Sequence, residues 1–276
     1  MALTPELLKR IMYSKYLLQR AQALNAEGHE LALGASILAA HDAVEMVMKV
    51  VTDTLNVPWA HEFKKFWSLV EQKTGTLPPR LGAMDQLNDD RNGFKHKGIL
   101  PNPTNASERL RNSLEFCEEI SQQYLNVDYQ SVSLADLIQN ILARAKIKEA
   151  ESEKENGNLP AAITKLGLAF DDLLGEAREK HKEALVGHIP ILGREFVQSV
   201  ASESLKSKLH KVAETVDSLI LGIDLAKLRR FSEITPMRQH TAYEVTLIWT
   251  RDWNSLTIED FHFCRTFVID FGLQLL

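Results

Sequence analysis

The sequence has few cysteines and no long apolar run, and each shortage excludes a class of protein. Cys117 and Cys264 are its only cysteines and form no CxxC pair, so neither a disulfide framework nor a structural zinc site is indicated. The longest weakly polar run, residues 31–40, is far too short to cross a bilayer, and the N-terminal segment has no uninterrupted apolar stretch. We therefore expect a cytoplasmic protein with no membrane association.

A strong charge of either sign is also missing. The formal net charge is −5 over 276 residues. A nucleic-acid ligand would therefore have to be met by a local basic patch, because the molecule as a whole would repel a polyphosphate. With 45% hydrophobic and 25% charged residues, the composition is typical of a globular protein with a full core.

Apolar residues recur at helical spacing, and the first half of the chain has no convincing strand alternation. Thr4, Pro5 and Glu6 supply a capping hydroxyl, a proline at the first helical position and an acid in the first turn. A first helix is expected from there to about residue 25. Further helices are expected over residues 30–55, 62–72, 81–94 and 107–126. The sequence therefore predicts an all-α fold.

The second half of the chain repeats this pattern at two offsets. An offset of 129 residues (157 minus 28) places Gly28 on Gly157, and it also brings the apolar positions of a long helix into register. An offset of 147 (264 minus 117) places Cys117 on Cys264, each preceded by a phenylalanine. The alternative explanation is chance alignment of amphipathic helices that share one period. The two cysteines occupy equivalent apolar faces, which favours small buried residues over nucleophiles.

We therefore predict two related helical bundles arranged as tandem repeats. The first spans residues 1–126 and the second spans residues 134–276. Residues 126–133, which read NVDYQSVS, form the predicted linker between them.

The chemistry of the first half is concentrated in the stretch LNDDRNGFKHKGILP. Residues four apart share a helical face, so Asn92 and His96 can meet, while Arg91 shares its face with Lys95. At about 100° per residue, Arg91 and His96 diverge by roughly 140° on a regular helix. A bend, which Gly93 permits, or the long reach of arginine is needed for both to touch one phosphate.

These residue types suit cleavage of RNA phosphodiesters. A histidine titrates near neutrality and can move protons to or from a ribose hydroxyl, and an arginine offers forked donors as charge develops on the phosphate. Asn92 can orient either group. The alternative interpretation is a solvated face, on which Arg91 and Lys95 form ordinary ion pairs with Asp89 and Asp90.

No metal or other cofactor is expected. The adjacent acids of Asp89-Asp90 and of Asp171-Asp172 point about 100° apart on a helix and do not converge on one ion. His41 and Glu45 lie four apart on an apolar helix and can form a metal pair. A satisfied core or interface histidine is the favoured interpretation, since its counterpart Phe170 is apolar.

The motif of Arg91, Asn92 and His96 resembles that of the HEPN superfamily, all-helical proteins whose nuclease members carry an arginine, a polar residue and a histidine a few residues further on. The resemblance covers roughly the first half of the chain, and the second half only through the repeat. It implies metal-independent endoribonuclease activity, at a composite site where two motifs face each other across a homodimer. It also implies a toxin, antiviral or RNA-processing role, with RNA as substrate and a cognate antitoxin or defence-system protein as a possible partner. The alternative is a non-catalytic interaction or nucleotide-binding module of the same superfamily.

In the second half, the offset of 147 places Arg238 opposite Arg91, Gln239 opposite Asn92 and Tyr243 opposite His96. This degenerate copy lacks the histidine. Either Arg238, His240 and Tyr243 complete a site within one chain, or two chains pair their own motifs, which we prefer. The residues expected to bind substrate are Lys95, Lys97, Arg238, His240 and Tyr243.

Overall fold

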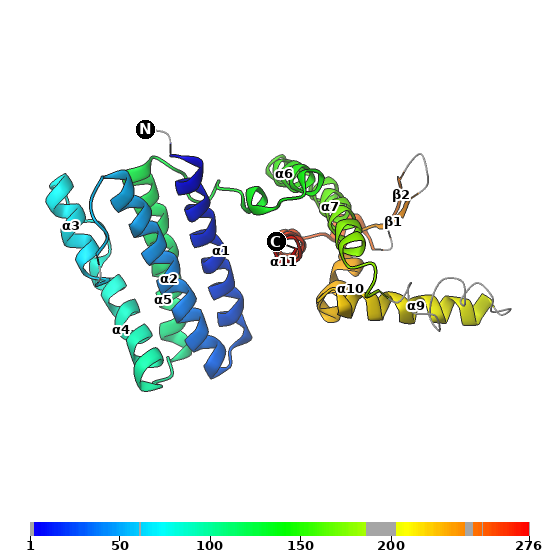
Figure 1. The fold of residues 1–276 in the computed structure, drawn as a ribbon, viewed down its shortest axis with the longest axis horizontal. Coiled ribbons are helices and arrows are strands. Elements are labelled where there is room, and N and C mark those ends of the chain that lie inside the picture. Colours follow the sequence, from blue (N-terminus) through cyan, green and yellow to red (C-terminus); the bar gives the residue numbers. More distant parts are fainter. Residues whose placement is uncertain (1–2, 61, 186–202, 241–244, 250, 276) are drawn as a thin grey trace. The chain divides into compact units, whose positions relative to one another are not determined.

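The computed structural model describes residues 3–60, 62–185, 203–240, 245–249 and 251–275. The chain divides into two compact units, Met1–Leu134 (unit 1) and Ala135–Leu276 (unit 2), which are described separately. Helices account for most of the described residues in both units, which agrees with the predicted all-α class (Figure 1).

Unit 1 is a bundle built around its second helix. Its elements are α1 (Pro5–Glu27), α2 (Glu30–Thr54), α3 (Lys65–Thr74), α4 (Leu81–Lys97), α5 (Pro103–Ile120) and a π-helical turn, η1 (Ser121–Leu125), that continues α5. Helix α2 contacts α1, α3, α4 and α5, and more of its side chains are buried than in any of those helices. By length and composition alone α2 could cross a membrane, but 61% of its most apolar window is buried in the bundle, as in the core helix of a globular protein.

The helix boundaries of unit 1 follow capping groups that the sequence displays. The Thr4 hydroxyl accepts the Leu7 amide at 3.3 Å, and Gly28 ends α1 in the left-handed conformation with φ 74°. Helix α5 begins at Pro103, four residues before the expected start, because the Asn102 side chain accepts the Thr104 amide at 2.8 Å. Helix α4 continues three residues beyond the expected end.

The segment predicted to be a linker packs on unit 1. The Tyr129 side chain is buried, and its hydroxyl lies 3.0 Å from the Ser14 hydroxyl. The buried Lys15 ammonium donates to the carbonyls of Gln130 and Val132 at 2.5 and 2.6 Å. The Val132 bond is buried and the Gln130 bond is part-buried, so Lys15 supplies a donor where water has limited access, and the chain stays attached to α1 up to the unit boundary at residue 134.

Unit 2 begins with a helical hairpin and contains a small sheet. Its elements are α6 (Ile141–Glu155), α7 (Leu159–Lys180), α9 (Glu203–Ile220), α10 (Leu225–Ile234), β1 (Met237–His240), β2 (Val245–Ile248), the short 3-10 turn η4 (Trp253–Ser255) and α11 (Ile258–Gln274), with the turn η2 (Leu134–Leu137) at the unit boundary. A cluster of aromatic rings with centroids 4.8–5.3 Å apart joins α7, α10 and α11, and consists of Phe170, Phe231, Phe267 and Phe271.

A small two-stranded sheet lies in unit 2, in a chain that otherwise has the predicted all-α character. Strands β1 and β2 pair antiparallel, with Arg238 opposite Leu247. Thr235 is already extended, with ψ 151°, because Pro236 disfavours helical backbone in the residue before it. The motif in α4 has no proline at the equivalent point, residue 89. Arg238 therefore lies on a strand, whereas Arg91 lies on a helix.

Replacing Lys15 by methionine should lower the free energy of unfolding of unit 1 by about 1.5–3 kcal/mol, because a buried carbonyl and a part-buried carbonyl lose their charged donor. A urea titration of the full chain measures the change. The exposed Lys9, on the same helix, is the matched control, and Lys9→Met should change stability by less than about 0.5 kcal/mol. Equal effects of the two substitutions would contradict the anchoring role of Lys15.

Candidate functional site

The Phe94 ring, in the last two turns of α4, packs directly against Gly34 of α2. A Cβ atom placed on Gly34 would lie 2.3–2.6 Å from three carbons of the Phe94 ring, so only glycine leaves room for the ring. The fully buried side chains of α4, Met84 and Leu87, both precede the motif. Phe94 therefore sets the distance between α2 and the part of α4 that carries the motif.

The last turn of α4 is wider than an ordinary α-helical turn, because some of its backbone hydrogen bonds span more than four residues. The Gly98 amide reaches the carbonyls of both Phe94 and Gly93, and the Ile99 amide bonds the Gly93 carbonyl at 3.0 Å. Gly98 has φ 65°, the left-handed backbone that ends many helices, whereas Gly93 keeps ordinary helical backbone. Gly93 therefore does not adopt left-handed backbone, and the chain leaves the helix at Gly98.

The three motif side chains meet on this helix end. The Arg91 Nη1 atom donates to Asn92 Oδ1 at 2.9 Å and lies 3.4 Å from His96 Nε2. A guanidinium carries only donors, so Nε2 is the acceptor, and the proton of the neutral imidazole sits on Nδ1. The reach of arginine, together with the widened turn, overcomes the divergence expected between positions 91 and 96.

Arg91 forms no ion pair with the neighbouring acids among the described residues. Asp90 instead bonds the buried Arg109 of α5, with Arg109 Nε 2.9 Å from Asp90 Oδ2. Among the residues that the structure describes, no carboxylate oxygen lies within 4.0 Å of the Arg91 guanidinium. The ordinary surface ion pairs with Asp89 and Asp90 do not form, so the arginine is available to an anion.

Lys95, His96 and Lys97 add positive charge in the last turn of α4, and all three are exposed. Cations are favoured at a helix C-terminus by the helix dipole, which explains part of this clustering without a ligand. Neither lysine forms an ion pair within the described residues of the chain. This end of α4 is therefore a local basic patch on a protein of negative net charge.

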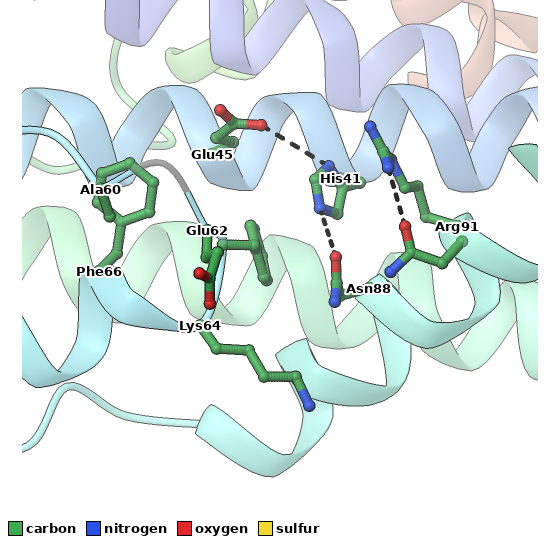
Figure 2. A pocket seen from close by; sticks show the side chains of 10 residues that line it. His41, Glu45, Ala60, Glu62, Lys64, Phe66, Asn88 and Arg91 are labelled. Carbon is green, nitrogen blue, oxygen red and sulfur yellow. Dashed lines mark hydrogen bonds and ion pairs between the residues drawn. The ribbon is translucent and has the colours of Figure 1, made fainter. Parts of the chain in front are cut away.

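A cavity of about 340 Å³ lies beside the motif, between α2, α4 and the segment before α3 (Figure 2). Its wall includes Arg91 and Asn92, together with Asn88, His41 and Phe63. The other charged side chains of the wall are paired with opposite charges: Glu45 with Lys49 at 2.7 Å, Glu62 with Lys65 at 2.8 Å, and Lys64 with Asp85 at 3.3 Å. Arg91 is the charged wall residue without such a partner in the described part of the chain.

Asn88 and His41 are parts of this site that sequence reasoning did not connect with the motif. Asn88 lies three residues before Arg91 and four before Asn92, a helical spacing that places all three on neighbouring positions of one surface. His41, on α2, is 2% exposed, and its Nε2 atom lies 3.2 Å from Asn88 Oδ1. Its ring packs on Phe63 with centroids 4.3 Å apart. The spacing of Asn88 was a usable signal, whereas the contact between α2 and α4 was not visible in the sequence.

Arg238, expected to bind substrate, has a structural environment within unit 2. Its guanidinium donates to both carboxylate oxygens of Asp171 at 2.7 and 3.1 Å, to the Thr235 hydroxyl at 3.1 Å and to the Pro236 carbonyl at 2.7 Å. A Cβ atom on Gly167 would lie 2.7 Å from Arg238 Nη1, so the side chain lies closely on α7. These bonds use most of the five donors of arginine.

Tyr243 and the side chain of His240 lie outside the described residues.

Both cysteines lie in apolar cores. Cys117 and Cys264 are buried, and burial raises the pKa of each thiol to about 12. A thiol that stays protonated at neutral pH is a poor nucleophile. This agrees with their interpretation as small buried residues.

Comparison of the chain with protein-family models, with curated proteins and with solved structures gave no match.

Gly34→Ala should lower the free energy of unfolding of unit 1 by about 1–3 kcal/mol, because the Phe94 ring must move to admit the new methyl group. Replacing the ring by a smaller side chain in the double variant Gly34→Ala, Phe94→Leu should recover part of the lost free energy of unfolding. Denaturant unfolding of the full chain measures both.

Gly82→Ala, at the start of α4, is the matched control, because a Cβ atom there meets nothing within 4 Å. It should be neutral or stabilising by up to about 1 kcal/mol, since alanine favours the helix. A tolerated Gly34→Ala would show that Phe94 does not fix α4 on α2.

Proposed function

We propose that the chain is a metal-independent endoribonuclease of the HEPN type. The observation that carries this proposal is the hydrogen-bonded cluster of Arg91, Asn92 and His96 on an exposed basic helix end. An arginine and a histidine that pointed apart would have favoured a non-catalytic interaction module. Such an activity suits a cytoplasmic toxin or antiviral effector that is kept in check by a cognate protein.

In this proposal the substrate phosphate replaces His96 as the partner of Arg91. The guanidinium then binds the phosphate through its forked donors, and the lone pair of His96 Nε2 becomes free. His96 takes the proton of the ribose 2′-hydroxyl, the 2′-oxygen attacks phosphorus, and the bond to the 5′-oxygen breaks. The products are a 2′,3′-cyclic phosphate and a 5′-hydroxyl, and no step needs a metal ion. Asn92 keeps Arg91 in place.

The 5′-oxygen must receive a proton as it leaves, and one imidazole cannot take and give a proton at the same moment. A second copy of His96, from a second chain, would supply the acid, which leads us to propose a homodimer with two motifs facing one cleavage site. Lys95 and Lys97 would then contact flanking phosphates, and part of that interaction would weaken with salt. The cavity beside Asn88 and Asn92 would hold a neighbouring nucleotide, since its volume lies within the range of about 300–1,000 Å³ for small-molecule pockets.

We further propose that the two units descend from one ancestral bundle. Gly28 and Gly157, equivalent at the offset of 129, both adopt left-handed backbone, with φ 74° and 79°, and the next helices begin at the equivalent residues Glu30 and Leu159. Each unit opens with a packed helical hairpin, α1 on α2 and α6 on α7. The correspondence is interrupted after α10, where unit 2 forms strands, and resumes at α11, where Cys264 is equivalent to Cys117 of α5. Tyr243 stands opposite His96, so the second unit would contribute no catalytic histidine.

His96→Ala should reduce the rate of RNA cleavage by about 10²- to 10⁴-fold, the usual contribution of a general acid or base. The assay uses purified full chain, a mixed RNA substrate and a chelator, with the product ends identified. His181→Ala, which removes an exposed histidine of unit 2, should leave the rate unchanged. Cleavage that survives His96→Ala, or that yields 3′-hydroxyl ends, would exclude this mechanism.

Specific activity should rise with protein concentration over the range in which a dimer forms, because each cleavage site needs two copies of His96. Sedimentation and RNA cleavage are measured on the same samples. Excess His96→Ala chain should suppress wild-type activity by drawing wild-type chains into dimers with a single histidine. Full activity at concentrations where the chain is monomeric would contradict the two-chain site.

A further inference from the structure

His41 has a buried nitrogen that no hydrogen bond satisfies. The side chain is 3% exposed, and Nδ1 has no hydrogen-bond partner among the residues that the structure describes. Nε2 is occupied, since Asn88 Oδ1 accepts from it at 3.2 Å. This bond places the proton of a neutral imidazole on Nε2 and leaves a lone pair on Nδ1. A buried polar atom without a partner is costly and needs an explanation.

Two carboxylates face that lone pair. Asp42 Oδ1 lies 3.7 Å and Glu45 Oε2 lies 4.0 Å from His41 Nδ1, and Figure 2 shows the Glu45 carboxylate directed at the ring. The other oxygen of Glu45 bonds Lys49 at 2.7 Å, which leaves Oε2 for the histidine side. Within the described residues, three acceptors thus converge with no donor between them, an arrangement that a cation stabilises.

We propose that His41, Asp42 and Glu45 bind a divalent transition-metal cation such as zinc. An imidazole nitrogen and two carboxylate oxygens form a ligand set that zinc accepts, with metal–ligand distances of about 2.0–2.2 Å. Tetrahedral bonds of that length place neighbouring ligand atoms about 3.4 Å apart. The three ligand atoms lie within 4.8 Å of one another, so small side-chain movements complete the set.

Asn88 would orient the His41 ligand through the hydrogen bond that it accepts from the other ring nitrogen. A histidine that binds a metal almost always donates its other ring N–H to an oxygen, which fixes the ring orientation, and Asn88 accepts such a bond from His41. Because Asn88 lies on α4 and the three ligands lie on α2, the cation would fasten α4 three residues before Arg91. Glu45 and His41 also line the cavity, which gives the cation and a bound water access to solvent.

The cation takes part in no step of the proposed RNA cleavage, and the inference does not depend on that function. The test is a calorimetric titration of metal-free full chain with Zn²⁺. We expect one zinc per chain, no saturable site in His41→Ala, and weaker binding in Glu45→Gln, which preserves the shape of the side chain. Asn88→Ala should weaken binding by about 10- to 100-fold.

Two controls separate this site from other histidines. His29→Asn removes an imidazole that lies 3.2 Å from the Glu27 carboxylate but keeps a capping side chain at the start of α2, so zinc binding should be unchanged. His96→Ala should also bind zinc normally, which keeps this result independent of the cleavage assay.

Circular dichroism of each variant without metal establishes that it is folded before titration. The proposal is overturned if wild-type chain binds no zinc, or if folded His41→Ala and Glu45→Gln both bind it as the wild type does. A nitrogen spectrum that shows both ring nitrogens of His41 protonated in the presence of zinc would likewise overturn it, because the proton would then occupy the place of the cation.

Discussion

The packing of Phe94 on Gly34 is the contact on which the geometry of the candidate site depends. The buried anchors of α4, Met84 and Leu87, precede the motif, so the turns that carry Arg91 and His96 are positioned against α2 by this ring. The close packing of α4 on α2 also places His41 within hydrogen-bonding distance of Asn88. The close approach of α4 to α2, which forms part of the cavity wall, therefore requires the absence of a Cβ atom at position 34.

Charge pairing decides which arginines are structural and which remain available. Asp90 bonds Arg109, and Asp171 bonds Arg238 through both oxygens. Each of these arginines has lost most of its water, which is tolerable only because an opposite charge and hydrogen bonds replace it. Arg91 instead contacts an amide oxygen and an imidazole, both neutral acceptors that a phosphate can displace. This difference supports a ligand-binding role for Arg91.

The sequence was sufficient for most of the helices of unit 1, because its capping residues and apolar periods act locally. Thr4 and Gly28 illustrate this, whereas α5 begins at Pro103, four residues before its expected start. The strand at Arg238 was missed because the repeat alignment carried a helix past Pro236. The meeting of Arg91 with His96 depends on a widened last turn, and the contact of His41 with Asn88 depends on how α2 and α4 pack. Neither can be read from spacing alone.

The account depends most directly on Arg91 and His96 behaving as one hydrogen-bonded unit, and the nitrogen chemical shifts of His96 report on that unit. In neutral His96, wild-type chain should carry the ring proton on Nδ1, with Nε2 accepting from Arg91. Arg91→Ala should remove this constraint on the tautomer. A wild-type spectrum in which Nε2 carries the proton, unchanged by Arg91→Ala, would contradict the account.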